Sequence, residues 1–335
     1  MASKPVVAIL LPKSTQQQVF SETTVARLNE RFDARWPKCE GKLPDDEAAG
    51  LLAEAEACMT GWSSPNVGGP LLAKAPKLRL LAHSAGTVKP YVSDELWKRG
   101  IVVTSAAAGI AVDVAHYTIG LMSIGRKNIM EISPQVNAGA WRDYQSYRRP
   151  ESLRRSVVGI IAASHVGRNV LNLLKHFDVT VLLYDPFCSE EKARELGAAK
   201  VELDDLFRRS DIVSVHAPSI PETRHMVNAQ RLALLKNGAV LINTSRGTLI
   251  DEAALVSALK KKRIWAFLDV TDSEPPAPNS PLYNCPNLTL SPHLAGSCGE
   301  VRKVLGEMAL EELDRFFKSE KPMYPVTQEM LERIG

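Results

Sequence analysis

The sequence predicts an α/β protein made of two doubly wound, Rossmann-like domains, each with a parallel sheet, and with a cleft between them. Three observations predict this fold class. The chain has 335 residues, which suits two domains of roughly 150 residues each. Apolar residues make up 45% and charged residues 24%, a composition typical of globular proteins with sizeable cores. Short apolar runs alternate with segments of helical period, which is the pattern of βαβ units.

Charge and composition argue against several other classes of protein. Lys plus Arg number 41 and Asp plus Glu 38, so the net charge is only +3, and no nucleic-acid partner is expected. We find no apolar run of membrane-spanning length and no signal-peptide pattern in residues 1–13, which predicts a cytoplasmic protein without a membrane partner. The five cysteines are scattered and form no C-x-x-C pair, so we expect reduced thiols and no metal site.

The first predicted unit covers residues 1–108. Short apolar runs at 6–11, 58–62, 78–84 and 101–105 predict its strands. Segments rich in Ala, Leu, Glu and Lys separate these strands, and a helix is predicted over 16–31, with further helical segments at 47–57 and 93–99. This alternation predicts parallel strands with helical crossovers.

The second predicted unit covers residues 109–299. It opens with 112–138, which has few helix breakers besides Pro134 and predicts a long helix that can carry a kink. A polar, arginine-rich stretch follows at 141–155, and a helix is predicted over 167–177. The predicted strands are 157–163, 179–184, 212–216, 239–244, 264–270 and 288–291. The amphipathic segment 300–318 predicts a closing helix, and the pattern alone leaves open whether residues 300–335 rejoin the first unit.

A candidate nucleotide turn follows the strand at 157–161. A dinucleotide site needs a strand, a tight glycine turn and a helix whose N-terminus faces the pyrophosphate. Position and flanks fit, but the G-x-G-x-x-G pattern is replaced here by A-x-S-x-x-G, from Ala162 through Ser164 to Gly167. One interpretation is an ordinary turn that binds nothing. In the other, the backbone amides of His165 and Val166 bind a pyrophosphate.

Two side chains beside this turn bear on the cofactor. The hydroxyl of Ser164 would donate to a phosphate oxygen, at some steric cost where glycine is usual. Asp185 ends the next strand and would accept the adenosine ribose hydroxyls. Because a carboxylate repels a 2′-phosphate, Asp185 favours NAD over NADP. Taken alone, Asp185 is better explained as a turn residue after a strand.

Three later segments carry reactive side chains at the ends of predicted strands. Arg246 follows the strand at 239–244, Asp269 lies at the end of the strand at 264–270 with Glu274 just after it, and His293 follows 288–291. Ligands of doubly wound folds bind at these strand ends, and a guanidinium can hold a carboxylate with two parallel hydrogen bonds. An imidazole, an acid and a guanidinium together suit carbonyl reduction. Each one alone is more often a salt-bridged arginine, a solvated acid or a loop histidine.

Taken together, these segments resemble the D-isomer-specific 2-hydroxyacid dehydrogenase family. The resemblance covers nearly the whole chain and is strongest over 157–296. It includes the stretch 213–218, the Thr-Arg-His run at 223–225 and the long run at 243–259. The family implies an NAD-dependent oxidoreductase that interconverts a D-2-hydroxy acid and its 2-oxo acid. Its corepressor members illustrate the alternative, a non-catalytic NAD-sensing binding protein on the same scaffold.

The resemblance also implies roles for individual residues. His293 would be the acid/base, and Glu274 would hydrogen-bond it and stabilise its charged form. Arg246 would hold the substrate carboxylate and polarise the ketone. The implied cofactor-binding residues are Ser164, His165, Val166, Asp185, Ala217, Pro218, Thr223, Thr244, Asp269 and Gly296. The implied substrate-binding residues are Ser84, Ala85 and Gly86, together with Arg246.

The same resemblance implies an assembly and a domain plan. The family is usually a homodimer formed through its NAD-binding domain, here residues 109–299. The substrate domain of the family joins the two ends of the chain. This implies a discontinuous substrate domain of residues 1–108 with 300–335.

Overall fold

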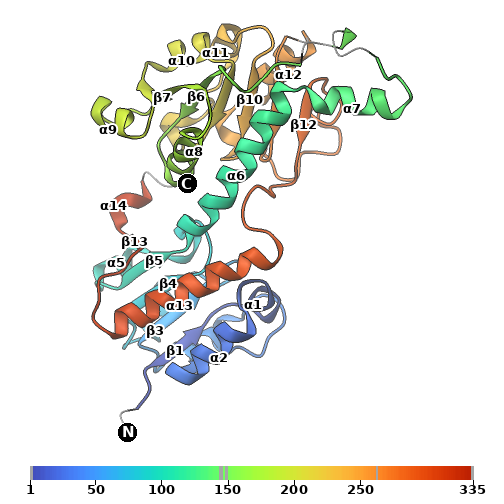
Figure 1. Ribbon diagram of the computed structural model, residues 1–335. Coiled ribbons are helices and arrows are strands. Elements are labelled where there is room, and N and C mark those ends of the chain that lie inside the picture. Colours follow the sequence, from blue (N-terminus) through green and yellow to red (C-terminus); the bar gives the residue numbers. More distant parts are fainter. Residues whose placement is uncertain (1–2, 143–145, 148–149, 262, 333–335) are drawn as a thin grey trace. The chain divides into compact units, whose positions relative to one another are not determined.

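The computed structural model describes residues 3–142, 146–147, 150–261 and 263–332. The chain forms two compact units, which are described separately here. Unit 1 joins the chain up to Ile110 with the chain from Ser297 onward, and unit 2 is Ala111–Gly296. The sequence placed these divisions at 108/109 and 299/300. Both units are α/β with sheets that are parallel or nearly so, which confirms the predicted fold class (Figure 1). The cleft between them stays a prediction.

Unit 1 is built on a six-stranded sheet in the order β13-β5-β4-β3-β1-β2. All neighbours are parallel except β13 and β5, which pair antiparallel at one edge. The five parallel strands follow one of the two common doubly wound orders. The strands are β1 (Val6–Ile9), β2 (Asp33–Arg35), β3 (Ala57–Thr60), β4 (Leu80–His83), β5 (Val102–Ser105) and β13 (Pro325–Val326).

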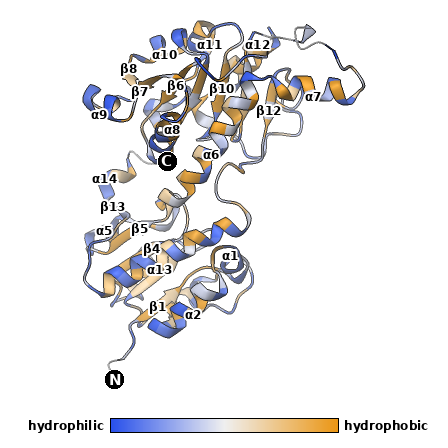
Figure 2. Ribbon diagram, in the orientation of Figure 1, coloured by the Kyte–Doolittle hydropathy of each residue, from blue (hydrophilic) through white to orange (hydrophobic). Residues whose placement is uncertain are grey.

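Helices cover both faces of this sheet. On one face α1 (Lys13–Val19), α2 (Glu22–Arg31) and α13 (Lys303–Phe317) pack over one buried cluster of the sheet. On the other face α3 (Asp45–Leu52), α4 (Gly69–Ala73) and α5 (Asp94–Lys98) pack over a second cluster. Figure 2 shows hydrophobic residues concentrated on the strands. Because helices cover both faces, the central strands are apolar almost throughout, and they appear in the sequence as clear apolar runs.

The helix predicted over 16–31 is two helices. α1 ends at Val19 and α2 begins at Glu22. Ser21 separates them as the N-cap of α2, where its side-chain oxygen accepts a hydrogen bond from the amide of Thr24 at 3.1 Å. A serine that caps a new helix interrupts an otherwise continuous helical period.

Unit 2 is built on a seven-stranded parallel sheet in the order β12-β11-β10-β9-β6-β7-β8. The first strand along the chain, β6, lies between β7 and β9, so the winding direction reverses between β6 and β9. Ligands of doubly wound sheets bind at that switch point. The strands are β6 (Val157–Ile161), β7 (Thr180–Tyr184), β8 (Ala199–Lys200), β9 (Ile212–Val215), β10 (Val240–Asn243), β11 (Trp265–Leu268) and β12 (Leu288–Leu290).

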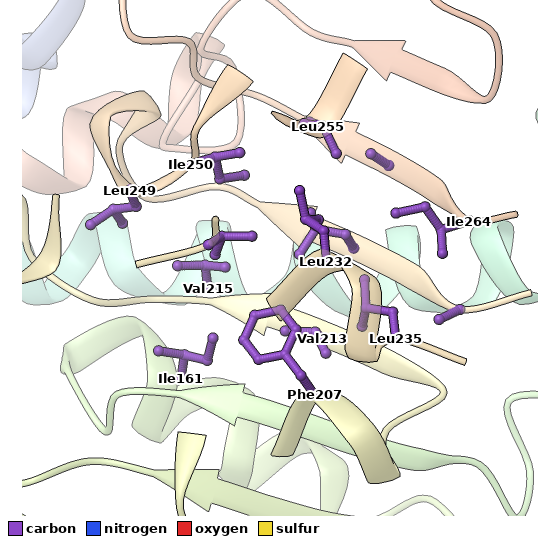
Figure 3. Close-up of a cluster of buried hydrophobic side chains, with 14 of the residues drawn as sticks. Ile161, Phe207, Val213, Val215, Leu232, Leu235, Leu249, Ile250, Leu255 and Ile264 are labelled. Carbon is purple, nitrogen blue, oxygen red and sulfur yellow. The ribbon is translucent and has the colours of Figure 1, made fainter. Parts of the chain in front are cut away.

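Two buried clusters hold this sheet between helices. α10 (Leu203–Arg209), α11 (Ala229–Leu234) and α12 (Glu252–Lys260) pack on one face. Figure 3 shows part of this cluster, with the ring of Phe207 among aliphatic side chains. α6 (Ala107–Arg126), α8 (His165–Leu174) and α9 (Glu190–Glu195) pack on the opposite face. The remaining short helices of the described chain are α14 (Gln328–Leu331) and the 3-10 turns Lys89–Tyr91, Pro221–Thr223, Gly247–Leu249 and Gly299–Arg302.

The long helix predicted over 112–138 is also two helices. α6 spans Ala107–Arg126 and α7 spans Ile129–Asn137. The chain breaks at Asn128, whose φ is 53°, a left-handed conformation that asparagine tolerates better than most residues. Pro134, the helix breaker of this segment, lies inside α7. A single asparagine in the left-handed conformation therefore separates α6 from α7, and the helical period of the sequence does not predict this break.

α6 corrects the expectation that no apolar run reaches membrane-spanning length. Among the described residues it is the one helix that is long and apolar enough, with 20 residues and a mean hydropathy of 1.4 over its best window. A third of that window is buried inside the protein. A core helix passes the same test, and Leu121 and Met122 of α6 pack in the cluster under unit 2's sheet. Alanine, valine and isoleucine residues keep the mean hydropathy of α6 high, while Asp113 and His116 interrupt them, so the sequence does not show α6 as one continuous apolar run.

Candidate active site

The turn after β6 keeps the backbone of a nucleotide turn without its first two glycines. Ala162 adopts a φ of 75°, the left-handed region that usually selects glycine. A Cβ on Gly167 would lie 2.0 Å from the carbonyl oxygen of Ala162, so the close approach of helix and strand requires glycine there. The turn is therefore compact enough to bring a ligand against the first turn of α8.

Ser164 is the N-cap of α8. Its side-chain oxygen accepts a hydrogen bond from the Gly167 amide at 3.2 Å. This bond uses a lone pair of the hydroxyl and leaves its proton available to donate to a ligand. The amides of His165 and Val166 belong to the first helical turn, which has no preceding carbonyls to bond. Helix dipole, amides and hydroxyl together fit a pyrophosphate.

Asp185 at the end of β7 braces this turn. One carboxylate oxygen accepts from the Ala163 amide and the other from the Phe187 amide, both at 2.8 Å. Each oxygen keeps a further lone pair that can accept from a ribose hydroxyl. Nearby, partial burial lowers the pKa of His165, and the Arg168 guanidinium lowers it further. His165 therefore meets a ligand as a predominantly neutral side chain near pH 7.

The turn after β10 positions Arg246. Asn243 closes this turn, since its amide nitrogen donates to the Arg246 carbonyl at 2.8 Å and its oxygen accepts from the Ser245 amide at 3.0 Å. The adjoining Gly247 lies against the turn after β11, because a Cβ there would stand 1.9 Å from the carbonyl carbon of Thr271. This close approach brings Arg246 toward the loop that carries Glu274.

Glu274 and His293 form a hydrogen-bonded pair. The distance between His293 Nδ1 and Glu274 Oε2 is 2.6 Å, and the two side chains are 51% and 39% exposed. Since a carboxylate only accepts, Nδ1 carries the proton and Nε2 is left to exchange protons with a ligand. Burial lowers the pKa of Arg246, and the Glu274 carboxylate opposes this shift. The structure therefore brings these three side chains into one site in unit 2.

Asp269, buried at the end of β11, holds the loop that carries His293. Its Oδ1 accepts from Ser291 Oγ at 2.5 Å and from the Leu294 amide at 2.9 Å, and its Oδ2 accepts from the Ala295 amide at 2.8 Å. Its backbone carbonyl also accepts from the His293 amide at 2.8 Å. His293 itself has a φ of 52°. Three of these four contacts are made by the carboxylate of Asp269, a predicted cofactor-binding residue, so this side chain also orders the loop of His293.

Other predicted cofactor residues lie on neighbouring strand ends of unit 2. The carbonyl of Ala217 accepts from Ser245 Oγ at 2.6 Å, which ties the turn after β9 to the turn after β10. Pro218 begins a short loop that Thr223 closes by donating to the Pro218 carbonyl at 2.6 Å. Thr244 directly follows β10 and is buried. Gly296 is the last residue of the continuous part of unit 2.

The predicted substrate loop lies in unit 1, at the end of β4. Ser84 is fully buried and donates to the Thr60 carbonyl at 2.9 Å. The carbonyls of Ala85 and Gly86 accept from Ser105 Oγ, at 3.2 and 2.6 Å. Since the carbonyls of this loop face Ser105, the loop is anchored within unit 1. Its binding role stays a prediction.

Comparison with known proteins decides the family. A model described as the NAD binding domain of D-isomer specific 2-hydroxyacid dehydrogenases matches residues 119–295, more than half of the chain. The chain belongs to the D-isomer-specific 2-hydroxyacid dehydrogenase family. The predicted family is thereby confirmed. Unit 2 contains the NAD-binding domain of this dehydrogenase family, and the cofactor is a nicotinamide dinucleotide.

Individual relatives of this dehydrogenase family differ in their named substrates. A glyoxylate reductase from Korarchaeum cryptofilum is 31% identical over 320 residues, covering 92% of this chain and 94% of that protein. A D-3-phosphoglycerate dehydrogenase from Methanocaldococcus jannaschii is 32% identical over 260 residues, 77% of this chain, which spans about half (49%) of that protein. The solved NADPH-dependent glyoxylate/hydroxypyruvate reductase of Sinorhizobium meliloti, in complex with citrate, has a TM-score of 0.73 and 26% identity, covering 98% of this chain and 100% of that one.

Sequence reasoning did not assign a role to two of the residues that shape this site. Asn243 closes the Arg246 turn, and its signal was an amide side chain at the end of an apolar strand. Ser291 links Asp269 to the His293 loop, and nothing in its local sequence indicated this. Both act through hydrogen bonds rather than through chemistry of their own.

Proposed function

We propose that the chain interconverts a D-2-hydroxy acid and the corresponding 2-oxo acid. The observation that carries this proposal is the His293–Glu274 hydrogen bond beside Arg246, within an NAD-binding domain. When bound, the nicotinamide supplies or accepts the hydride. The side chains of the protein bind the carboxylate of the substrate and transfer the proton.

His293 Nε2 is the proposed proton-exchanging atom. With Nδ1 bonded to Glu274, Nε2 gives a proton to the carbonyl oxygen during reduction and takes it from the hydroxyl during oxidation. The Glu274 carboxylate stabilises the imidazolium that oxidation leaves behind. Arg246 binds the substrate carboxylate and stabilises the negative charge that grows on the carbonyl oxygen.

The test of this function is oxidation of NADH, followed at 340 nm, with glyoxylate, hydroxypyruvate and bulkier 2-oxo acids. We expect turnover with at least one of them. The variant His293→Asn should lower kcat at least ~100-fold, because the acid/base is lost. Asparagine is preferred to alanine because it tolerates the left-handed backbone of His293. His176→Asn, an exposed histidine just after α8, is the matched control and should keep full turnover.

Two outcomes contradict the proposal. Binding of NADH without turnover on any 2-oxo acid would favour the non-catalytic NAD-sensing alternative. Normal turnover by His293→Asn would remove the acid/base role.

Arg246→Ala should lower kcat/KM for 2-oxo acids by at least ~100-fold while NADH still binds, since misplacing a reactant by 1 Å already costs that much. Weaker NADH binding alone would mean that Arg246 serves the cofactor.

NAD is the proposed dinucleotide rather than NADP. Asp185 supports this choice, since a fixed carboxylate beside the ribose repels a 2′-phosphate. The S. meliloti relative is named as NADPH-dependent, so the two cofactors must be compared directly. We expect kcat/KM to be at least ~10-fold higher with NADH, as one like-charge contact of about 1.4 kcal/mol provides. Equal values would contradict the assignment to Asp185.

We further propose a homodimer formed through unit 2. Exposed apolar side chains on α6 and α7 support it, among them Ile124, Ile129 and Met130. Clustered apolar groups of this kind mark interaction surfaces. Light scattering should give the mass of two chains, and Met130→Glu should give the mass of one. A monomeric wild type would contradict the proposal.

A further inference from the structure

Tyr117 of α6 begins a chain of two hydrogen bonds that ends on Asp269. Its hydroxyl donates to Ser291 Oγ at 3.0 Å, and Ser291 Oγ donates to Asp269 Oδ1 at 2.5 Å. Tyr117 and Ser291 are 174 residues apart. The ring of Tyr117 packs against the cluster between α6 and the sheet, so its hydroxyl has little freedom. Ser291 stands two residues before His293.

Thr118, the next residue of α6, makes the equivalent contact to a second strand end. Its hydroxyl donates to the Val114 carbonyl at 2.8 Å, and its oxygen lies 3.1 Å from Thr244 Oγ1. Since the proton of Thr118 is used, Thr244 donates across this contact. Thr118 is fully buried and Thr244 nearly so. Thr244 stands two residues before Arg246.

These contacts join three adjacent strand ends of one sheet. β10, β11 and β12 are neighbours, and Thr244, Asp269 and Ser291 each follow one of them directly. Neighbouring residues of a helix point about 100° apart, so Tyr117 and Thr118 reach different strand ends from the same turn. We infer that Tyr117 and Thr118 are positioning residues, which set the placement of His293 and Arg246 respectively. This inference rests on the proposed function.

The Tyr117 contact and the Thr118 contact, called here the Tyr117 arm and the Thr118 arm, predict different changes in the kinetic constants. Tyr117→Phe removes one hydroxyl, loosens the Ser291–Asp269 bond and displaces His293, so kcat should fall about tenfold while the KM for NADH stays within about twofold. Thr118→Val leaves Thr244 without its acceptor and displaces Arg246, so the KM for the 2-oxo acid should rise about tenfold. A merely structural role would lower the melting temperature without this division between kcat and KM.

A double-mutant cycle tests the Tyr117 arm further. If Tyr117 acts through Ser291, the double variant Tyr117→Phe, Ser291→Ala should have the same kcat as Ser291→Ala alone. Effects that multiply would overturn the inference for this arm. Thr118→Ser keeps the hydroxyl and should restore the wild-type KM, which separates the lost hydrogen bond from altered packing. Circular dichroism of each variant establishes that it is folded before kinetics are compared.

His293→Asn separates this inference from the proposed function. If His293→Asn is inactive while Tyr117→Phe and Thr118→Val both have wild-type kinetics, the positioning roles are wrong and the proposed function stands. If His293→Asn is fully active, the proposed acid/base role of His293 fails, and if the wild type turns over no 2-oxo acid the proposed function fails, whatever the α6 variants do.

Discussion

At the residue scale, Ala162 keeps the left-handed backbone of the proposed nucleotide turn without being a glycine. The left-handed φ of 75° is retained although alanine carries a Cβ. Such a conformation costs roughly 1–2 kcal/mol for a residue with a side chain, while glycine adopts it freely. The turn is held because the Ala162 amide donates to the Tyr184 carbonyl at 2.8 Å and the Ala163 amide to Asp185 at 2.8 Å.

Ala162→Gly should therefore stabilise the protein. We expect the free energy of unfolding to rise by about 1 kcal/mol, because relief of the strained backbone exceeds glycine's extra entropy in the unfolded chain. Urea unfolding followed by circular dichroism measures this change. Ala163→Gly is the matched control. Ala163 does not have a positive φ, so glycine at this position should lower the free energy of unfolding by about 0.5–1 kcal/mol. Loss of stability in both variants would contradict the argument.

The same scale explains what the sequence could predict of the site. Arg246, Glu274 and His293 were found because strand ends in doubly wound folds collect ligands and their residue types suit carbonyl chemistry. The positive φ of Ala162 could not be predicted from the sequence, since a motif specifies which residue is present and not its backbone conformation. The Tyr117–Ser291 bond was also beyond reach, because it joins residues 174 positions apart without any charge or periodicity.

At the element scale, Ser164 caps α8 and lies in the turn that is proposed to bind the cofactor. Ser164→Ala removes the cap on Gly167, so we expect a loss of about 1 kcal/mol in the free energy of unfolding and weaker binding of NADH. Ser21→Ala removes the cap of α2 in unit 1 and should cost similar stability without changing NADH affinity. Isothermal titration of NADH compares them. If Ser164→Ala and Ser21→Ala bind NADH with equal affinity, Ser164 has no part in cofactor binding.

Strand burial decided which elements the sequence predicted. β1, β3, β4 and β5 lie in predicted apolar runs because helices cover both faces of their sheet. β2, β8 and β13 were missed. They are edge strands of two or three residues, such as Asp33–Arg35, and each has at most one buried side chain, so none forms an apolar run. Short edge pairing depends on neighbouring strands, which local sequence does not encode.

At the scale of the whole molecule, each unit contains one deeply buried histidine. Burial lowers the pKa of His83 in unit 1 to about 3, and that of His216 in unit 2 to about 3. The unfolded chain takes up these protons near pH 6.5 and the folded chain only near 3. The unfolded state therefore binds more protons between these values, and stability falls as the pH is lowered through this window.

We expect the free energy of unfolding to drop between pH 7 and pH 5, by about 2 kcal/mol for each buried histidine. Urea unfolding at the two pH values measures the drop. In unit 1 the buried Glu312, whose pKa burial raises, acts in the opposite direction, so His216 gives the clearer effect. His216→Asn cannot titrate and should reduce the pH dependence even if it lowers stability overall. An unchanged pH dependence in that variant would exclude His216 as its source.

Unit 1 is interrupted by all of unit 2, and this has a consequence for synthesis. Leu310 and Leu313 of α13 cover one face of a sheet whose strand β1 is made some 300 residues earlier. Domains usually fold in the order in which the ribosome makes them. Here the nascent chain completes its middle domain first, and the part of the unit 1 sheet that α13 covers stays exposed to solvent until α13 emerges.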